Sequence, residues 1–483
     1  MKDNKIIDNS ALMPEYVPDG EVRLISAGEN TGGPYTPDWA ESLIMMEIHL
    51  ETATPEGTFQ AGIKALDHCA ETGVNGIWLT PVYEKGKGGN GYGNIGPHSV
   101  EPALTGTPAP DYEEGWKIVK WYVGEAHKRN IRVILDIITW GTVTASPLFA
   151  GHPDWYEGKA WGNEAFNWKN EEFVEWFISR AVENIVRTGA DGYRADCEPH
   201  HAGYEVFGEI RRRLLEKGRK ILIIAEDSCR HGDAYDFEQD GMLDYTGWDR
   251  GAQYADPKKF YIDHLNIVDS IKNGTGIGSP DLQRSDSGGM YRLYTYCVSN
   301  HDYVYSIVNG NRLVLGYQAI FAPFIPLWYL GEEFNLVNIN SVFYFLPVDW
   351  TLMDKQENRE FFEDIKKYIQ IRRAYPEIFT YSPASHRDSN ICKVNAKNQP
   401  LQAYARYAGN KGVIIIGNND GSGPVNFEIT FPFDDMGLGV YNEFAVTNLM
   451  TGEKTAAGSK SDTGVFTAKV EYLHIGVYLI EGK

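Results

Sequence analysis

The feature of this sequence that most constrains its fold is a regular alternation of short apolar segments with amphipathic helical segments. A strand is predicted at residues 43–50 and a helix at 58–71, in which Phe59, Ile63 and Leu66 recur at helical spacing. The same pair of signals returns through most of the chain. Strands that alternate with helices predict a parallel sheet with helices packed against it.

The alternation continues long enough to close such a sheet into a barrel. Eight strands are predicted, at residues 43–50, 74–82, 131–136, within 189–196, and at 220–226, 242–245, 293–300 and 325–330. Eight strand–helix units over about 340 residues are typical of a (β/α)8 TIM barrel. We therefore expect an irregular lead-in at 1–38 and an α/β barrel at 39–381, with a short insert at about 139–168.

The pattern changes after the helix predicted at residues 359–375. Short alternating runs at 402–407, 412–417 and 472–480 are separated by turns rich in Asn, Gly and Asp. Such runs predict a small antiparallel β-sandwich at 382–483.

Composition argues against some classes of partner. The formal net charge of −21 disfavours nucleic acid and an anionic membrane surface. The five cysteines lack metal-ligand spacing, so neither a zinc site nor a disulfide framework is predicted, and no cofactor is expected. The first residues contain no apolar signal segment, and no stretch reaches about 18 apolar residues. We expect a cytoplasmic protein, although a secreted protein trimmed of its signal would have the same sequence, and the oligomeric state is not indicated.

Four acidic residues lie at, or just after, the ends of predicted barrel strands: Asp136, Asp196, Glu226 and Asp302. The C-terminal ends of barrel strands meet at one mouth, so these carboxyl groups should face each other. Cleavage of a glycosidic bond with retention needs two carboxyl groups about 5–5.5 Å apart, one to attack the anomeric carbon and one to protonate the leaving oxygen. The sequence therefore indicates a glycoside-processing site.

The strand that ends at Asp196 is the best defined of these. A helical pattern stops at Gly189, and Arg194 and Asp196 then alternate with Tyr193 and Ala195, which places the two charged side chains on one face. Taken alone, this segment fits an ion pair at a strand end as well as it fits a catalytic nucleophile.

Together these segments resemble the α-amylase superfamily of glycoside hydrolases and transglycosylases, in which a catalytic barrel is followed by a β-sandwich. The resemblance covers nearly the whole chain from about residue 40. Residues 189–196 resemble the fourth-strand motif of the family, which implies that Asp196 is the nucleophile and that Arg194 orients it and keeps its pKa low. Glu226 matches the acid/base residue that ends the fifth strand.

Other matches imply further site residues. Asn300, His301 and Asp302 resemble the motif after the seventh strand, which implies that Asp302 stabilises the transition state and that His301 binds a sugar hydroxyl. The resemblance also implies that Tyr92 stacks on the sugar and that His200 lies near the leaving-group side.

The resemblance implies retaining hydrolysis of α-glucosidic linkages in oligosaccharides or glucans through a covalent glycosyl-enzyme. Partial burial and the neighbouring carboxylate are expected to raise the pKa of Glu226 for its acid role. A transglycosylase or isomerase would share the first half-reaction. A non-catalytic carbohydrate-binding barrel is the third alternative.

The third strand departs from the family. The family motif reads Asp-x-x-x-Asn-His, but this chain has Trp140 and Gly141 after Asp136. A Trp side chain cannot ligate calcium, which prefers oxygen donors, so the calcium site of the family is not expected here and no metal is predicted. Trp140, together with Trp155 and Trp161, could pack its loop or face sugar, and Trp140 is counted among the candidate substrate-binding residues.

Overall fold

The structure is a computed structural model of the 483-residue chain. It describes residues 35–86, 91–108, 110–227, 234–238, 293–297, 300–302, 315–316, 319–320, 325–336, 346–379, 391–397, 403–418 and 423–483. Most of the predicted lead-in at 1–38 lies outside these residues, as does the strand predicted at 242–245.

Eight parallel strands pair side by side in a closed ring, in the order β1-β11-β10-β9-β8-β7-β3-β2. Their bounds are β1 Met45–Ile48, β2 Gly76–Leu79, β3 Arg132–Ile138, β7 Gly192–Asp196, β8 Leu222–Ala225, β9 Phe237–Glu238, β10 Leu293–Cys297 and β11 Ile325–Tyr329. The predicted parallel sheet is therefore present. The sixth strand of the ring is β9, which precedes the segment predicted for it.

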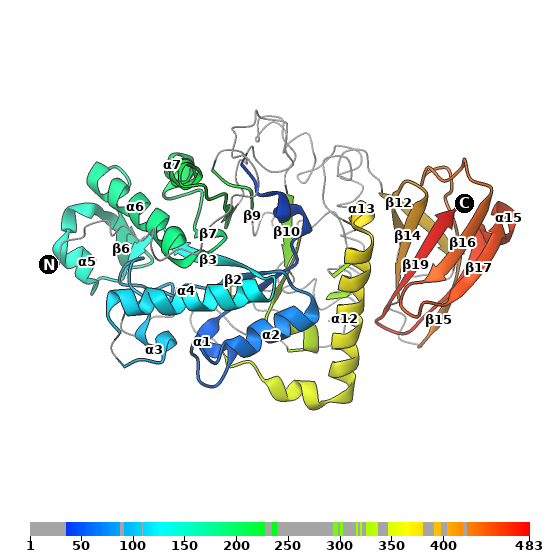
Figure 1. Cartoon of the computed structure of the whole chain (residues 1–483), viewed down its shortest axis with the longest axis horizontal. Helices are drawn as coiled ribbons and strands as arrows, with labels where there is room; N and C mark the ends of the chain where they lie inside the picture. The colour runs from blue at the N-terminus through cyan, green and yellow to red at the C-terminus, as the bar shows by residue number, and fades with distance from the viewer. Residues whose placement is uncertain are drawn as a thin grey trace.

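Helices lie along the outside of the barrel strands (Figure 1). The long ones are α2 Ile63–Thr72, α4 Tyr112–Lys128, α6 Glu171–Thr188, α7 Gly203–Glu216 and α12 Gln356–Ala374. Local chemistry sets their ends. Asp111 caps α4 by accepting a hydrogen bond from the Glu114 amide, and α6 stops at Gly189, whose φ of 77° is left-handed. Short helices α1 Leu50–Ala53, α3 Pro102–Thr105 and α13 Pro376–Phe379 lie in the connections.

The insert between β3 and α6 forms a small sheet of its own. Strands β4 Gly141–Thr142, β5 Tyr156–Ala160 and β6 Asn163–Phe166 pair antiparallel in the order β4-β6-β5. Helix α5 Pro147–Gly151 and the 3-10 turn Pro153–Trp155 complete the insert. The insert thus extends β3 into a β-hairpin layer at the mouth end of the barrel.

The C-terminal part is an antiparallel sheet of eight strands, in the order β17-β16-β19-β14-β13-β12-β15-β18. The bounds are β12 Ile391–Lys397, β13 Ala403–Ala408, β14 Lys411–Gly417, β15 Val425–Thr430, β16 Glu443–Asn448, β17 Lys454–Ser459, β18 Val465–Val470 and β19 Ile475–Gly482, with α15 Lys460–Thr463 between β17 and β18. This agrees with the antiparallel strands predicted from the sequence.

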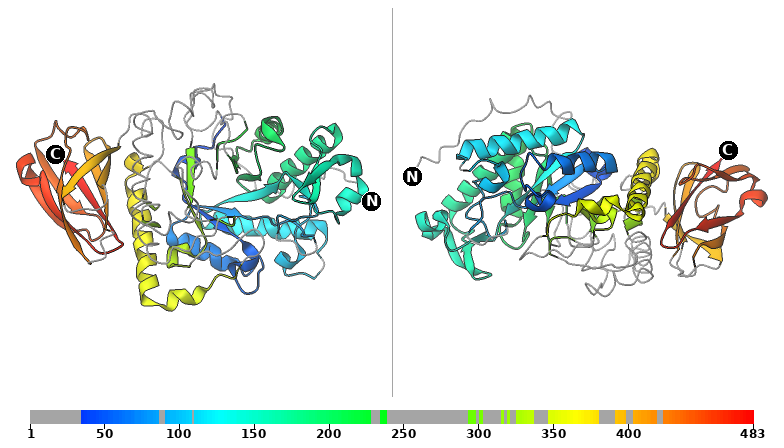
Figure 2. Two further views of the ribbon diagram at one scale, coloured as in Figure 1. Left: turned by 180° about the vertical axis from the view of Figure 1, so that it is seen from behind. Right: turned by 90° about the horizontal axis from the view of Figure 1, so that it is seen from below.

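Alternation along β14 joins this sheet to the barrel. Val413 and Ile415 belong to the same buried cluster as the barrel core, whereas Ile414 and Ile416 belong to a second core within the C-terminal sheet. Helix α12 stands between the barrel strands and the C-terminal sheet in all three views (Figures 1 and 2). Among the helices that the structure describes, none is long and apolar enough to cross a membrane.

Candidate active site

Arg194 on β7 is the centre of the site. Its side chain is fully buried, and its guanidinium group forms ion pairs with three carboxylates. Nη1 lies 2.6 Å from Asp196 Oδ1 and 3.3 Å from Asp136 Oδ2, and Nη2 lies 3.0 Å from Glu226 Oε1. Strand register explains the convergence, because Asp136 on β3 pairs with Arg194 and Glu226 directly follows β8.

The two carboxyl groups predicted to be nucleophile and acid/base lie together. Oxygens of Asp196 and Glu226 are within 4.8 Å of each other, and the Cys197 thiol lies within the same distance of both. The Cys197 amide donates a hydrogen bond of 2.6 Å to Glu226 Oε2. Among the residues that the structure describes, this is the one cluster with the ligand atoms for a metal ion, but the Arg194 charge already faces both carboxylates.

The protonation of this pair differs from the prediction. Burial, followed by the charge of Glu226, raises the pKa of Asp196 well above its usual range, although Arg194 opposes the shift. Burial also disfavours the charged form of Glu226, but Arg194 and the Cys197 amide outweigh it and lower the pKa of Glu226. The expectations of a low pKa for Asp196 and a raised pKa for Glu226 are therefore wrong for this arrangement. The reason is that Arg194 pairs with both carboxyl groups, while only Glu226 also receives an amide hydrogen bond.

Asp302 and His301 lie at the same mouth. His301 is buried, and its Nε2 lies 3.3 Å from Asp302 Oδ2, while the Asp302 amide donates to Asn300 Oδ1 at 2.9 Å. On its other side, His301 Nδ1 lies 2.7 Å from Oε1 of Glu47 on β1. The structure thus brings all three predicted catalytic acids together around Arg194 and His301.

Tyr92 is also at the site, with its ring committed to protein neighbours. It stacks on His301 with ring centroids 4.6 Å apart and an angle of 7° between planes. Its hydroxyl donates to Asp136 Oδ2 at 3.1 Å, and Trp78 Nε1 donates to the same oxygen at 3.0 Å. Burial raises the pKa of Asp136 to about 6 against the opposing charge of Arg194. Asp136 therefore acts as a buried anchor for Arg194 and Tyr92.

His200 and Trp140 lie further out. His200 is mostly exposed and reaches Asp227 Oδ2 at 3.5 Å. Trp140 is only 5% exposed and packs edge-on against Trp161, with ring centroids 5.6 Å apart. Trp161, at the turn between β5 and β6, is 70% exposed and lies 6.2 Å from the ring of His201. Substrate binding by His200 and Trp140 stays a prediction, and Trp161 offers the larger open aromatic surface.

The departure at the third strand has a structural reason at Gly141. Its φ is +154°, and a Cβ atom there would lie 1.9 Å from the carbonyl oxygen of Glu164 on β6. A histidine, which the family has here, does not fit this backbone. In this chain Gly141 is the first residue of β4.

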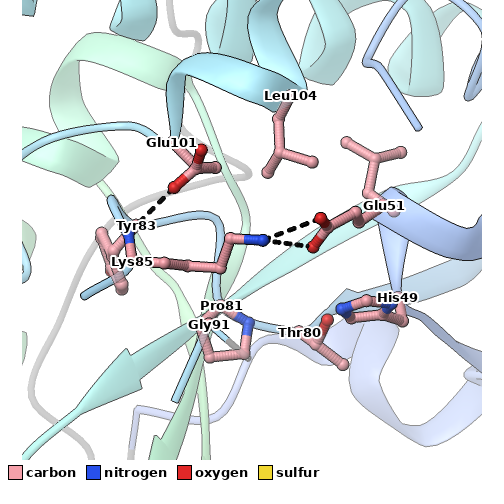
Figure 3. A pocket seen from close by; sticks show the side chains of 10 residues that line it. His49, Glu51, Thr80, Pro81, Tyr83, Lys85, Gly91, Glu101 and Leu104 are labelled. Carbon is pink, nitrogen blue, oxygen red and sulfur yellow. Dashed lines mark hydrogen bonds and ion pairs between the residues drawn. The ribbon is translucent and has the colours of Figure 1, made fainter. Parts of the chain in front are cut away.

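A small hollow beside the site is not a sugar pocket. Figure 3 shows Lys85 reaching across it to Glu51, with Nζ 2.7 Å and 2.6 Å from the two carboxylate oxygens. The Lys85 amide donates to Glu101 Oε2 at 2.9 Å. The cavity volume of about 10 Å³ is the size of one water molecule.

Glu47 is the site residue that the sequence analysis missed. Its side chain is 0% exposed, and it interrupts the otherwise apolar strand β1. A buried acid within an apolar strand was the available signal, because such a group needs a charged partner.

No family model matches the chain. Over 349 residues it is 24% identical to a malto-oligosyltrehalose trehalohydrolase from Saccharolobus solfataricus. The aligned residues make up 63% of this chain and 59% of that protein. It is also 24% identical to an α-amylase from Haloarcula japonica, over 93% of this chain and 65% of the relative. The chain thus spans about three fifths of the length of these relatives.

Solved structures share the fold. An α-amylase from Geobacillus thermoleovorans, complexed with acarbose, superposes with a TM-score of 0.65 and 17% identity, covering 92% of this chain and 99% of that chain. A debranching enzyme from Nostoc punctiforme gives a TM-score of 0.67 and 17% identity, covering 95% and 100%. Sequence relatives and structural neighbours agree with the resemblance found in the strand motifs. The chain is similar in sequence to α-amylases and malto-oligosyltrehalose trehalohydrolases, and it shares the fold of solved α-amylases.

Proposed function

We propose that this chain is a retaining glycoside hydrolase that cleaves α-glucosidic linkages in oligosaccharides or glucans. The observation that carries the proposal is the pair of carboxyl groups, Asp196 and Glu226, whose oxygens lie within 4.8 Å. That separation suits double displacement, whereas inversion needs about 6.5–9.5 Å to admit a water molecule between the groups. The relatives that are amylases and trehalohydrolases by name support the substrate class.

In this mechanism Asp196 attacks the anomeric carbon while Glu226 gives its proton to the leaving oxygen. The glycosidic bond breaks as a bond to the Asp196 carboxylate forms. Glu226 then removes a proton from water, the water oxygen attacks the same carbon, and Asp196 is released. Asp302, paired with His301, would stabilise the positive charge that develops on the sugar ring.

The protonation of the pair adds a requirement. The arrangement in the structure favours the proton on Asp196, so the proton must be on Glu226 before the acid step. A sugar that separates Glu226 from Arg194 and from the Cys197 amide would remove the two interactions that lower its pKa. Substrate binding would then raise the pKa of Glu226 and leave Arg194 to stabilise charged Asp196.

The finer architecture is part of the same proposal. We place a complete (β/α)8 barrel at 39–381 and a β-sandwich at 382–483, with the barrel carrying the chemistry. The closed ring of strand pairings and the separate core of the C-terminal sheet support this division.

Product analysis tests the function directly. The wild-type protein and Asp196→Ala are incubated with maltose, isomaltose, trehalose, sucrose and longer glucans, and the products are separated by chromatography. Hydrolysis predicts free glucose or shorter oligosaccharides from the wild type and a loss of several orders of magnitude in the variant. New linkages in place of free sugar would favour transfer or isomerisation. Tight sugar binding with no turnover of any substrate would favour a binding protein.

A further inference from the structure

The mechanism above leaves the buried charge of Glu47 unused. Glu47 lies on β1, in the wall of the barrel, with a side chain that is 0% exposed. Oε1 lies 2.7 Å from His301 Nδ1, and among the described residues Oε2 has no hydrogen-bond partner. A buried carboxylate with so few partners is costly to keep, so its one strong contact should have a purpose.

The surroundings of His301 fix the orientation of its ring. Tyr92 stacks on one face, and the Trp78 ring meets the imidazole edge-on with centroids 5.3 Å apart. Glu47 then faces Nδ1, and Asp302 faces Nε2 at 3.3 Å. The imidazole therefore lies between two carboxylates, one in the barrel wall and one at the mouth.

This placement has a consequence for the protons. A neutral imidazole carries one N–H and one acceptor nitrogen, and a carboxylate can only accept. With a carboxylate at each nitrogen, both nitrogens must carry protons for both contacts to be favourable. With Glu47 and Asp302 both ionised, the geometry therefore selects the imidazolium form.

Charges from five elements bear on His301. They are Glu47 on β1, Asp136 on β3, Arg194 on β7, Glu226 after β8 and Asp302 after β10, and His49, which directly follows β1, also faces His301. Burial and Arg194 oppose the charged ring, but Asp302 and Glu47 outweigh them and raise the pKa of His301 to about 10. Burial raises the pKa of Glu47, although the charge of His301 acts to lower it.

We propose that Glu47 is a positioning residue that keeps His301 doubly protonated, so that Nε2–H holds Asp302 in place as an anion facing the sugar. The role in turnover rests on the proposed glycosidase function, but the protonation of His301 does not. Without the Glu47 charge, Asp302 would be left to oppose burial and Arg194, so the pKa of His301 would fall and Asp302 would lose its charged partner as the ring loses its proton.

Loss of the Glu47 charge should make the protonation of His301 depend on pH. The usual pKa of histidine is about 6.5, and the pKa of His301 in the wild type is raised to about 10. Between these two pH values the ring of His301 therefore stays charged, whereas an ordinary histidine would be neutral. In Glu47→Gln the ring would lose its proton as pH rises through a much lower pKa. The deficit of the variant should therefore grow with pH, and the ratio of wild-type to variant kcat/KM removes any pH dependence that both proteins share.

The experiment uses the full chain in three variants. Glu47→Gln keeps the shape and removes the charge, and Glu47→Asp keeps the charge. Glu333→Gln is the matched control, because Glu333 Oε1 lies 2.5 Å from His68 Nε2 in another buried pair, packed against α12 rather than at the mouth. Imidazole NMR signals of His301, assigned by their loss in His301→Gln, are followed from pH 5 to 9, and kcat/KM on a maltooligosaccharide is measured over the same range.

We expect His301 to stay doubly protonated to about pH 9 in the wild type, Glu47→Asp and Glu333→Gln, and to titrate within the range in Glu47→Gln. The ratio of wild-type kcat/KM to that of Glu47→Gln should increase at least about tenfold between pH 5 and 8. The same ratio for Glu333→Gln should not change with pH. Identical titration of His301 in the wild type and Glu47→Gln, or a neutral ring in the wild type at pH 7, would overturn the proposal. If no substrate is turned over but His301 titrates as expected, the glycosidase function fails and the role of Glu47 stands.

Discussion

Strands β3 and β7 are neighbours in the barrel, but their ends are built in different ways. The end of β7 presents Arg194 and Asp196, both buried and linked by a contact of 2.6 Å. The end of β3 keeps Asp136 as a partner of Arg194 and then turns, at Gly141, into the insert sheet. Buried charges at the first end depend on each other, so none can change alone. Beyond Asp136 the second end still contacts the nucleophile strand through the Thr139 hydroxyl, which donates to the Asp196 carbonyl oxygen at 2.6 Å, but Trp140 and Gly141 after it belong to the insert.

The largest expected effect at the charged end comes from Glu226→Gln. Removal of the acid should lower kcat/KM on maltooligosaccharides by roughly 10²–10⁴-fold. On α-glucosyl fluoride, whose leaving group needs little protonation, the loss should be much smaller. Steady-state kinetics on both substrates measures the difference, with circular dichroism as the check of folding. Equal losses on the two substrates would mean that Glu226 is not the general acid.

At the divergent end, Gly141→Ala tests the backbone explanation. A Cβ would lie 1.9 Å from the Glu164 carbonyl oxygen, and the φ of +154° is strained for alanine. We expect a loss of about 1–3 kcal/mol in the free energy of unfolding, measured by chemical denaturation. Gly151→Ala is the control, because a Cβ at that last residue of α5 meets nothing within 4 Å. Similar stability of the two variants would remove the reason given for the missing histidine.

The smallest effect is expected for Trp161→Ala. The ring is 70% exposed, so stability should change by less than about 0.5 kcal/mol. If the ring stacks on sugar units beyond the cleaved bond, KM should rise about 2–10-fold for long oligosaccharides and stay unchanged for maltose. Trp121→Ala is the control, since Trp121 is 42% exposed on the outside of α4. Matching KM values for Trp161→Ala and the wild type on every chain length would show that the insert does not bind substrate.

The sequence was sufficient for the parts of the structure that rest on periodicity. The helix predicted at 58–71 overlaps α2, because the apolar spacing of Ile63 and Leu66 is a local signal. The gathering of Asp196, Glu226 and Asp302 also followed from strand order alone. The sixth strand was less predictable, since β9 has only two residues and carries little pattern.

Other features depended on contacts across the barrel. The pKa directions of Asp196 and Glu226 depend on the Cys197 amide and on how one guanidinium group is shared, which no spacing reveals. The partnership of Glu47 with His301 joins residues 254 positions apart. The clash at Gly141 depends on the pairing of β4 with β6, which the sequence analysis did not anticipate.

The central claim is that Asp196 forms a covalent bond to the sugar. A fluorinated α-glucosyl fluoride, which forms the intermediate faster than water releases it, would trap that bond for mass spectrometry of proteolytic peptides. The account predicts one added glycosyl group, located on Asp196 and absent from Asp196→Ala. A label on a different residue, or turnover of the reagent by the wild type with inverted configuration and no label, would contradict it.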